Sequence, residues 1–265
     1  MFTRAFLEET GNGRLRREEQ MLSAELARRG IPVSLFTIKR IERRQLPLSA
    51  ETFIAGGMDA MHGAMRQLKI EIPAPNDYPT SLRTFMHRRI WRSSLGRVER
   101  EVVEDGGEPV FAKPADRRKS FTGRAFASVD DFREIGNVSR RQEVWCSQVV
   151  AWASEIRVYV IGQEVARIDH YAGNAEVALD RSTIDAALAA YRTSAEAPSA
   201  YGIDFEVLTT GETALIEAND GYSLGAYQIG ESAYTDLLLT RWKELLSTNA
   251  APKTREDPGG APFSI

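Results

Sequence analysis

The stretch of sequence that decides the fold is IDFEVLTTGETALIEAND, residues 203–220. Apolar and polar residues alternate on both sides of a turn at residues 209–212. Since the side chains of a strand point alternately to its two faces, this pattern predicts a hairpin of strands 203–208 and 213–218. Pairing across the turn gives the hairpin one apolar face and one polar face.

The polar face of this hairpin carries two carboxylates at the same level. The predicted register pairs Leu208 with Thr213 and places Asp204 directly opposite Glu217. The apolar face then consists of the opposed pairs Ile203 with Ala218, Phe205 with Ile216, and Val207 with Ala214. Opposed side chains have Cβ atoms about 5 Å apart, so like charges there destabilise the hairpin unless a cation bridges them.

Asn219 points to the same side as Glu217, because it lies two residues further along the strand. The carboxylates and this amide form an all-oxygen set that suits Mg²⁺, which keeps some of its waters and shares its shell with substrate phosphates. A polar hairpin that faces solvent has the same pattern, so spacing alone leaves that alternative open.

A second signal is FAKPADRRKSFTGR, residues 111–124, in which Lys113 ends an apolar strand and a basic loop follows. Such a loop can fold over a triphosphate with its backbone N–H groups and cationic side chains, while Lys113 lies near the phosphates. The candidate loop residues are Lys119, Ser120 and Gly123. The spacing is not that of a Walker loop, and a basic surface turn is the alternative.

A third signal is SQVVAWASEIRVYVIG, residues 147–162, in which Glu155 and Arg157 share one face of a strand. Glu155 can accept both hydroxyls of a ribose, and Arg157 can hold a phosphate or carboxylate with two hydrogen bonds. A partly exposed salt bridge explains the pair equally well. The backbone groups that could meet an adenine edge belong to Gln148, Val149 and Val150.

The first 75 residues alternate short apolar runs with helical patterns, which predicts a small Rossmann-like α/β lobe. Its predicted strands are 2–7, 31–38 and 51–55, and its predicted helices are 15–29 and 58–67. The proline-rich stretch 73–79 is a predicted linker. Beyond it we expect a basic helix at 81–93, a strand-rich region after residue 108, helices at 182–193 and 234–246, and a disordered tail at 249–265.

Composition indicates a globular protein of 265 residues, with 43% hydrophobic and 27% charged residues. The net charge of -3 gives no electrostatic reason to bind nucleic acid or anionic lipid. The single cysteine, Cys146, excludes an internal disulfide and is expected to be a small buried hydrophobe. No signal-like or membrane-spanning apolar run is present, so we expect a cytoplasmic protein without a membrane partner.

The three signals together resemble the ATP-grasp superfamily over about residues 80–230. That family has a lysine on a lid strand, a flexible phosphate loop, an adenine-binding hinge, a ribose carboxylate and a D…E-x-N metal set. The fragments EIRV, YPTSLRTFMHRRIW, and DF…E-x-N ending in GYSLG look more narrowly like the clade named for its characteristic arginines and lysine. The matching positions are Lys113, Lys119, Ser120, Gly123, Gln148 to Val150, Glu155, Asp204, Glu217 and Asn219.

The resemblance implies a protein of mixed helices and strands, α/β in class with α+β character. A Rossmann-like pre-ATP-grasp lobe would cover 1–75 and an ATP-grasp domain 76–248. Within that domain the lid would cover about 100–150 and the C-terminal core about 151–248. The implied activity is an ADP-forming ligase that uses ATP and Mg²⁺ to convert a carboxylate to an acylphosphate and join it to an amine. Its partners would be carboxylate and amine substrates, either small molecules or peptides.

By the same resemblance, Lys113 and Arg157 would be the catalytic residues, and Asp204, Glu217 and Asn219 would hold the metal. An earlier basic residue of the family contacts phosphate, and here it corresponds to Arg88, with Arg89 as the alternative. Gln148 stands where many relatives have glutamate.

The sequence leaves the substrates open, and a homodimer is among the possible oligomeric states. Two other functions also remain open: a nucleotide-binding module that no longer catalyses a reaction, and an ATP-dependent phosphotransferase.

Overall fold

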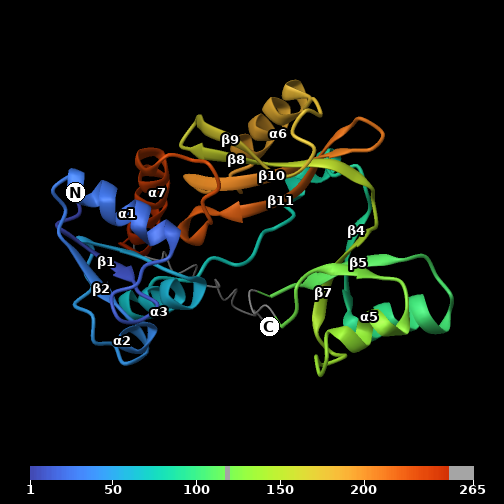
Figure 1. Ribbon diagram of the computed structural model, residues 1–265, viewed down its shortest axis with the longest axis horizontal. Coiled ribbons are helices and arrows are strands. Elements are labelled where there is room, and N and C mark those ends of the chain that lie inside the picture. The colour runs from blue at the N-terminus through green and yellow to red at the C-terminus, as the bar shows by residue number, and fades with distance from the viewer. Residues whose placement is uncertain (117–119, 251–265) are drawn as a thin grey trace, which may run out of the picture.

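The computed structural model describes residues 1–116 and 120–250, so Lys119 and residues 251–265 of the predicted disordered tail lie outside the described residues. The prediction of disorder is wrong for residues 249 and 250, which end a helix. Three sheets form an N-terminal lobe, a central body and a lid. Figure 1 shows the N-terminal lobe and the lid on either side of the central body, which carries the hairpin of residues 203–220. Among the described residues, no helix is both long and apolar enough to cross a membrane.

The N-terminal lobe is a parallel sheet of three strands in the order β2-β1-β3, with α1 and α3 as its main helices. The bounds are β1 (Arg4–Glu8), α1 (Arg17–Arg28), β2 (Val33–Phe36), α2 (Ile38–Glu42), β3 (Thr52–Ala55) and α3 (Met58–Leu68). The predicted alternation of strands and helices is confirmed. The predicted strand 31–38 is too long, because the chain turns into α2 at Ile38.

The basic helix predicted at 81–93 is wrong. A 3-10 helix, η1 (Thr80–Phe85), is followed by a turn and by the strand β4 (Ile90–Ser94). His87 has a positive φ of 48°, which no α-helix continues through. All five residues of β4 pair antiparallel with β7, so tertiary pairing outweighs the helical pattern of the sequence.

The lid contains the sheet β4-β7-β5-β6 and a hydrophobic core of its own. Its elements after β4 are α4 (Leu95–Glu99), the π-helix η2 (Arg100–Glu104), β5 (Val110–Pro114), β6 (Arg124–Phe126), α5 (Val129–Glu134) and β7 (Glu143–Gln148). The strand-rich region predicted after residue 108 is confirmed, and the apolar strand predicted to end at Lys113 corresponds to β5. The elements α4, η2, β6 and α5 were not predicted from the sequence.

The central body is an antiparallel sheet in the order β11-β10-β8-β9. Its elements are β8 (Trp152–Ile161), β9 (Glu164–Gly173), α6 (Arg181–Thr193), β10 (Ala200–Leu208), β11 (Thr213–Asp220), η3 (Gly221–Ser223) and α7 (Glu231–Ala250). One face packs against α6 and η1, and its core includes Ile203, Phe205 and Leu215. The opposite face of the sheet, away from this core, carries polar side chains.

The hairpin of β10 and β11 has the predicted pairing at its far end but not near its turn. Asp204 pairs with Glu217 and Ile203 with Ala218, as predicted. A bulge then shifts the register, so Phe205 pairs with Leu215 and Val207 with Thr213. The predicted pairs Phe205 with Ile216, Val207 with Ala214, and Leu208 with Thr213 are therefore wrong. Ile216 is the extra residue that restores the register at Asp204.

Candidate functional site

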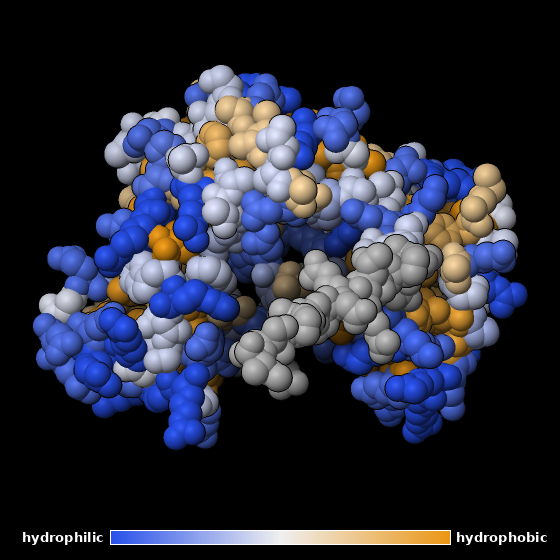
Figure 2. Space-filling view, turned by 180° about the vertical axis from the view of Figure 1, so that it is seen from behind, coloured by the Kyte–Doolittle hydropathy of each residue, from blue (hydrophilic) through white to orange (hydrophobic). Residues whose placement is uncertain are grey.

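A cavity of about 670 Å³ lies where the N-terminal lobe, the lid and the central body meet. Figure 2 shows the surface hollowed beneath the central body, between the lobe and the lid. The cavity is lined by the linker around Asp77, the lid strand around Lys113, and the end of β11. This volume is in the range of sites that bind small molecules, about 300 to 1,000 Å³.

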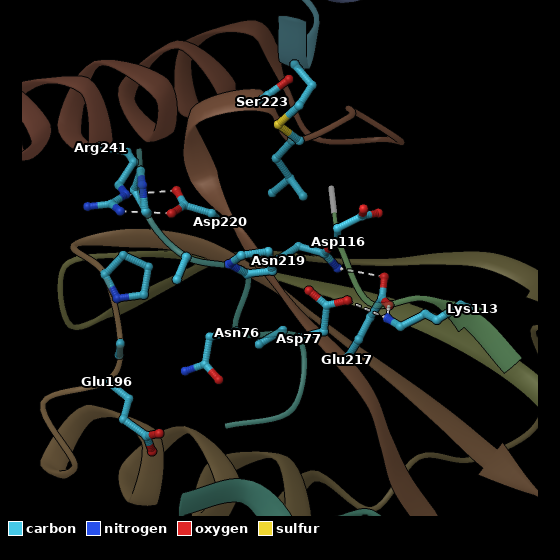
Figure 3. Close-up of a pocket in the computed structure, with 18 of the residues that line it drawn as sticks. Asn76, Asp77, Lys113, Asp116, Glu196, Glu217, Asn219, Asp220, Ser223 and Arg241 are labelled. Carbon is cyan, nitrogen blue, oxygen red and sulfur yellow. Dashed lines mark hydrogen bonds and ion pairs between the residues drawn. The ribbon is translucent and has the colours of Figure 1, made fainter. Parts of the chain in front are cut away.

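Three oxygen-bearing side chains lie together here: Glu217 and Asn219 line the cavity, and Asp204 is buried beside Asn219, outside the lining. Asp204 projects from β10, and Glu217 and Asn219 project from β11. Nδ2 of Asn219 donates to Oδ2 of Asp204 and to Oε1 of Glu217, at 3.2 Å each. Figure 3 shows Asn219 between the cluster of Lys113 and Glu217 and the pair of Asp220 and Arg241. The hairpin thus brings all three predicted ligands together, although whether they bind a metal stays a prediction.

Asp204 is neutralised by Arg157 rather than left to repel Glu217. Nε and Nη2 of Arg157 donate to the two carboxylate oxygens of Asp204, both at 2.7 Å. The two side chains are only 11% and 4% exposed. Burial raises the pKa of Asp204, although the Arg157 guanidinium opposes that rise. Burial acts to lower the pKa of Arg157, but the hydrogen bonds to Asp204 outweigh it, so the pKa of Arg157 is raised.

Glu217 is neutralised in the same way by Lys113. Nζ of Lys113 donates to Glu217, lies 2.7 Å from Oδ2 of Asp77, and stands 4.6 Å from the ring centre of Tyr78. Burial acts against charge on both partners, yet their attraction prevails. The pKa of Lys113 is therefore raised, and the pKa of Glu217 is lowered. The sequence-based argument that only a bridging cation makes the carboxylate pair tolerable is wrong, because each carboxylate has its own cationic partner.

The donor set nevertheless fits Mg²⁺. Its atoms are carboxylate and amide oxygens, and Asn219 lies within hydrogen-bond distance of both carboxylates. Among the described residues, no cluster of three or more His, Cys, Asp or Glu side chains is arranged to hold a metal. A site built from these residues therefore has two carboxylates and one amide, and leaves room in the metal's shell for phosphate oxygens and water.

The predicted phosphate loop borders the lid end of the cavity. Phe121, Thr122 and Gly123 line it together with Lys113. A Cβ atom on Gly123 would lie 2.9 Å from Cβ of Lys113 and 2.9 Å from Cζ of Phe111, so only glycine allows this approach. Ser120 donates to Oε1 of Gln142 at 3.3 Å.

The predicted nucleotide hinge lies between the lid and the central body, outside the lining of the cavity. Gln148 is tied to Arg89, whose backbone N–H donates to Oε1 of Gln148 at 2.8 Å. Val149 is 48% exposed, and Val150 is half-buried. Burial raises the pKa of Glu155, which is also hydrogen-bonded to Tyr171. The assignment of these residues to adenine and ribose stays a prediction.

The structure does not bring Arg88 into the cavity. Its guanidinium is engaged by Glu206 and by backbone carbonyls of β11. Arg89 instead lies over the ring of Trp91, at 4.4 Å from its centre.

Several residues of the site were missed by the sequence analysis. Asp77 and Tyr78 lie in the predicted linker 73–79 and were not assigned to the site, yet both contact Lys113. Tyr227 stacks on Tyr171 with ring centres 4.6 Å apart, and it lies 4.8 Å from the Arg157 guanidinium. Local sequence carries no signal for these contacts, because each joins segments far apart in the chain.

At the other end of the cavity, Arg241 forms an ion pair with Asp220 and Glu244. The Nε and Nη2 atoms of Arg241 each lie 2.8 Å from a carboxylate oxygen of Asp220. Asp220 directly follows Asn219 in β11, so the two ends of the cavity are connected along one strand.

A family model of the ATP-grasp domain matches residues 85–237, which is more than half of the chain. The chain belongs to this family, which is family 2 of the clade named for its characteristic arginines and lysine. The matched residues contain Lys113, Arg157, Asp204, Glu217 and Asn219. Family membership confirms the resemblance and the ATP-grasp fold that were inferred from the three sequence signals.

Solved structures have the same ATP-grasp fold. A D-alanine–D-alanine ligase from Bacillus anthracis has 15% identity and a TM-score of 0.56, covering 94% of this chain and 99% of that one. A RimK domain protein from Sphaerobacter thermophilus has 16% identity and a TM-score of 0.51, covering 91% and 99%. The ligase PsnB, complexed with a minimal precursor, Mg and ADP, has 12% identity and a TM-score of 0.52, covering 91% and 97%. Comparison with curated protein sequences gave no match.

Proposed function

We propose that this ATP-grasp protein is an ADP-forming ligase that joins a carboxylate to an amine. The observation that carries the proposal is the convergence of Asp204, Glu217 and Asn219 beside Lys113, with Glu217, Asn219 and Lys113 lining the cavity. A carboxylate pair with an adjacent amide and a buried lysine is what binding of Mg²⁺ and a triphosphate requires. The related folds include D-alanine–D-alanine ligase, which agrees with this reaction class.

In the proposed reaction, a substrate carboxylate oxygen attacks the γ-phosphorus of ATP and ADP leaves. An amine then attacks the acyl carbon, phosphate leaves, and the amine gives up a proton. Asp204, Glu217 and Asn219 would hold Mg²⁺, which supplies positive charge to the phosphates. Catalysis rests on positioning and electrostatics, and no side chain forms a covalent bond.

Lys113 is the first of two cationic groups with a proposed catalytic role. Its ammonium is held at the edge of the cavity and can exchange Glu217 and Asp77 for phosphate oxygens. Arg157 is the second, because Nε and Nη2 bind Asp204 while Nη1, among the described residues, has a single long hydrogen bond of 3.5 Å to the carbonyl of Gly225. Nη1 is therefore available to bind an anion such as the substrate carboxylate or its phosphoryl group.

The nucleotide part of the proposal uses the remaining predicted residues. Lys119, Ser120 and Gly123 would contribute the phosphate loop, and Glu155 with residues 148–150 would bind the ribose and adenine. The domain bounds that go with this proposal are a lobe at 1–75 and an ATP-grasp domain at 76–248.

The experiment is ADP release from the full chain with ATP, Mg²⁺ and pools of amino acids and short peptides. Release that requires both an acid and an amine is the expected result. ADP release that needs only one acceptor and forms no amide would identify a phosphotransferase. Tight ATP binding without turnover would identify a nucleotide-binding module. Either result would overturn the ligase proposal.

Lys113→Met should lower the turnover by about 100-fold or more, because the phosphate charge loses a preorganised cation. Lys243→Met is the matched control, since Lys243 is an exposed residue of α7 outside the cavity lining. Equal activity of the two variants would contradict the role of Lys113.

A further inference from the structure

Arg88 lies outside the cavity but contacts the strand that carries Glu217 and Asn219. Its Nη1 donates to Oε1 of Glu206 at 2.7 Å and to the carbonyls of Leu215 at 2.9 Å and Met86 at 3.0 Å. Its Nη2 lies 3.3 Å from the carbonyl oxygen of Ile216. The side chains of Arg88 and Glu206 are only 7% and 6% exposed. A buried arginine with this many partners has a fixed position.

The two β11 carbonyls that Arg88 contacts are those of the bulge. The register of β11 against β10 shifts between the pair Phe205 with Leu215 and the pair Asp204 with Glu217, which leaves Ile216 as the extra residue. In a regular strand, consecutive carbonyls point to opposite edges. One guanidinium reaches the carbonyls of Leu215 and Ile216 together because the bulge changes their directions.

This bulge allows Leu215 to face the hydrophobic core while Glu217 and Asn219 face the opposite side of the sheet, with Asp204. A slip of one residue moves every side chain of a strand to the opposite face of the sheet. If the pairing near the turn, Phe205 with Leu215, were continued without the bulge, Asp204 would lie opposite Ile216. Glu217 and Asn219 would then point toward the hydrophobic face covered by α6. The bulge returns both residues to the face of Asp204.

We propose that Arg88 is a positioning residue that fixes this bulge, and with it the register that sets Glu217 and Asn219 beside Asp204. The inference rests on the proposed function for its catalytic meaning, because the metal-binding role of the three residues is itself a proposal. A nearby segment of the same chain also holds β11 in place. The Asp77 carbonyl accepts from the Ala218 N–H at 2.9 Å, so residues before and after η1 cover the outer edge of β11.

Holding the bulge requires the planar guanidinium group of arginine. Its separate nitrogens donate to Glu206 and to two carbonyls at once, whereas the single ammonium of lysine cannot span them in the same geometry. Arg88→Lys therefore keeps a positive charge beside Glu206 but should release part of the bulge.

The test combines two measurements on the full chain. Hydrogen exchange without nucleotide or metal should become faster in Arg88→Lys at the amides of residues 214–219. Titration with Mn²⁺ alone, followed by electron paramagnetic resonance, should give a dissociation constant about 10-fold or more higher than that of the wild type. Should this variant fail to fold, Arg88→Met combined with Glu206→Met removes both buried charges, and the same two results are expected.

Two control variants separate positioning from general destabilisation. Glu206→Gln leaves Arg88 on both carbonyls and should keep the wild-type Mn²⁺ affinity, even if the protein unfolds more easily. Arg83→Lys changes an exposed arginine of η1 and should alter neither measurement.

Wild-type exchange and Mn²⁺ affinity in Arg88→Lys would overturn the inference. So would an equal loss of affinity in Glu206→Gln. If the wild type itself does not bind Mn²⁺, the proposed function fails, and the exchange at residues 214–219 still decides the role of Arg88.

Discussion

The pair of Arg157 and Asp204 is a buried ion pair, with side-chain exposures of 11% and 4%. Removing only the arginine leaves a carboxylate without its counter-charge in a place that water barely reaches. We expect Arg157→Met to lower the free energy of unfolding by about 3 to 5 kcal/mol. Urea denaturation at neutral pH measures this quantity.

The matching control is an exposed pair of the same type. Arg181 and Asp185 are 55% and 58% exposed, so Arg181→Met should change stability by about 0.5 kcal/mol or less. Adding Asp204→Asn to Arg157→Met removes the unpaired charge and should recover part of the loss. If Arg157→Met had the same unfolding midpoint as the control, the ion pair would not be the stabilising contact inferred here.

At the scale of single elements, Gly123 allows the proposed phosphate loop to lie directly against β5. Gly123→Ala puts a methyl group 2.9 Å from both Lys113 and Phe111, closer than carbon atoms pack, so the loop must move away. We expect weaker ATP binding, by about 10-fold, because Lys113 and the loop lose their mutual position. Gly230→Ala is the control, since its Cβ would meet no atom of the described residues within 4 Å. Isothermal titration with ATP and Mg²⁺ would contradict the prediction by giving equal affinities.

The hairpin of β10 and β11 shows how far sequence reasoning extends. Alternation predicted both strands, the apolar face and the opposition of Asp204 and Glu217, because these follow from the period of a strand. It did not predict the bulge at Ile216. That irregularity depends on Arg88, which comes from a segment more than a hundred residues earlier in the chain.

The site shows the same limit. The spacing of motifs pointed to Lys113, Arg157 and the three candidate ligands, and the structure brings them together. Spacing alone says nothing about which charge pairs with which. The ion pairs of Arg157 with Asp204 and of Lys113 with Glu217 therefore emerge only from the fold. Likewise, the strand β4 forms through its partner β7, whereas the local pattern favours a helix.

At the scale of the whole molecule, the boundaries of the hydrophobic cores differ from the boundaries of the three sheets. One core joins the N-terminal lobe to α7 and to parts of the central body, and it includes Leu26, Tyr159 and Trp242. The indole N–H of Trp242 donates to the carbonyl of Thr52 in β3 at 2.9 Å. The lid has a separate core around Phe126 and Phe132. The lobe and the central body should therefore unfold together, whereas the lid can open by itself.

Hydrogen exchange on two core variants tests this division. Phe126 is fully buried in the lid core and packs against Phe132 with ring centres 4.5 Å apart. Phe126→Ala should remove about 3 to 5 kcal/mol of packing from the lid. Exchange should then become faster in β5, β6 and β7, while α1, α7 and the central sheet keep wild-type protection.

Leu26→Ala is the complementary change, because Leu26 is fully buried in the core shared by the lobe and α7. Its cavity should speed exchange in β1, β3 and α7 together and leave the lid strands nearly unchanged. Val129→Ala alters a residue of the lid helix α5 that is 40% exposed, and it should affect neither unit. Equal acceleration of lid and lobe amides in Phe126→Ala would mean that the chain opens as a single unit. A lid that opens alone would give ATP, the proposed substrate, a route to Lys113 without disrupting the sheet that holds Asp204, Glu217 and Asn219.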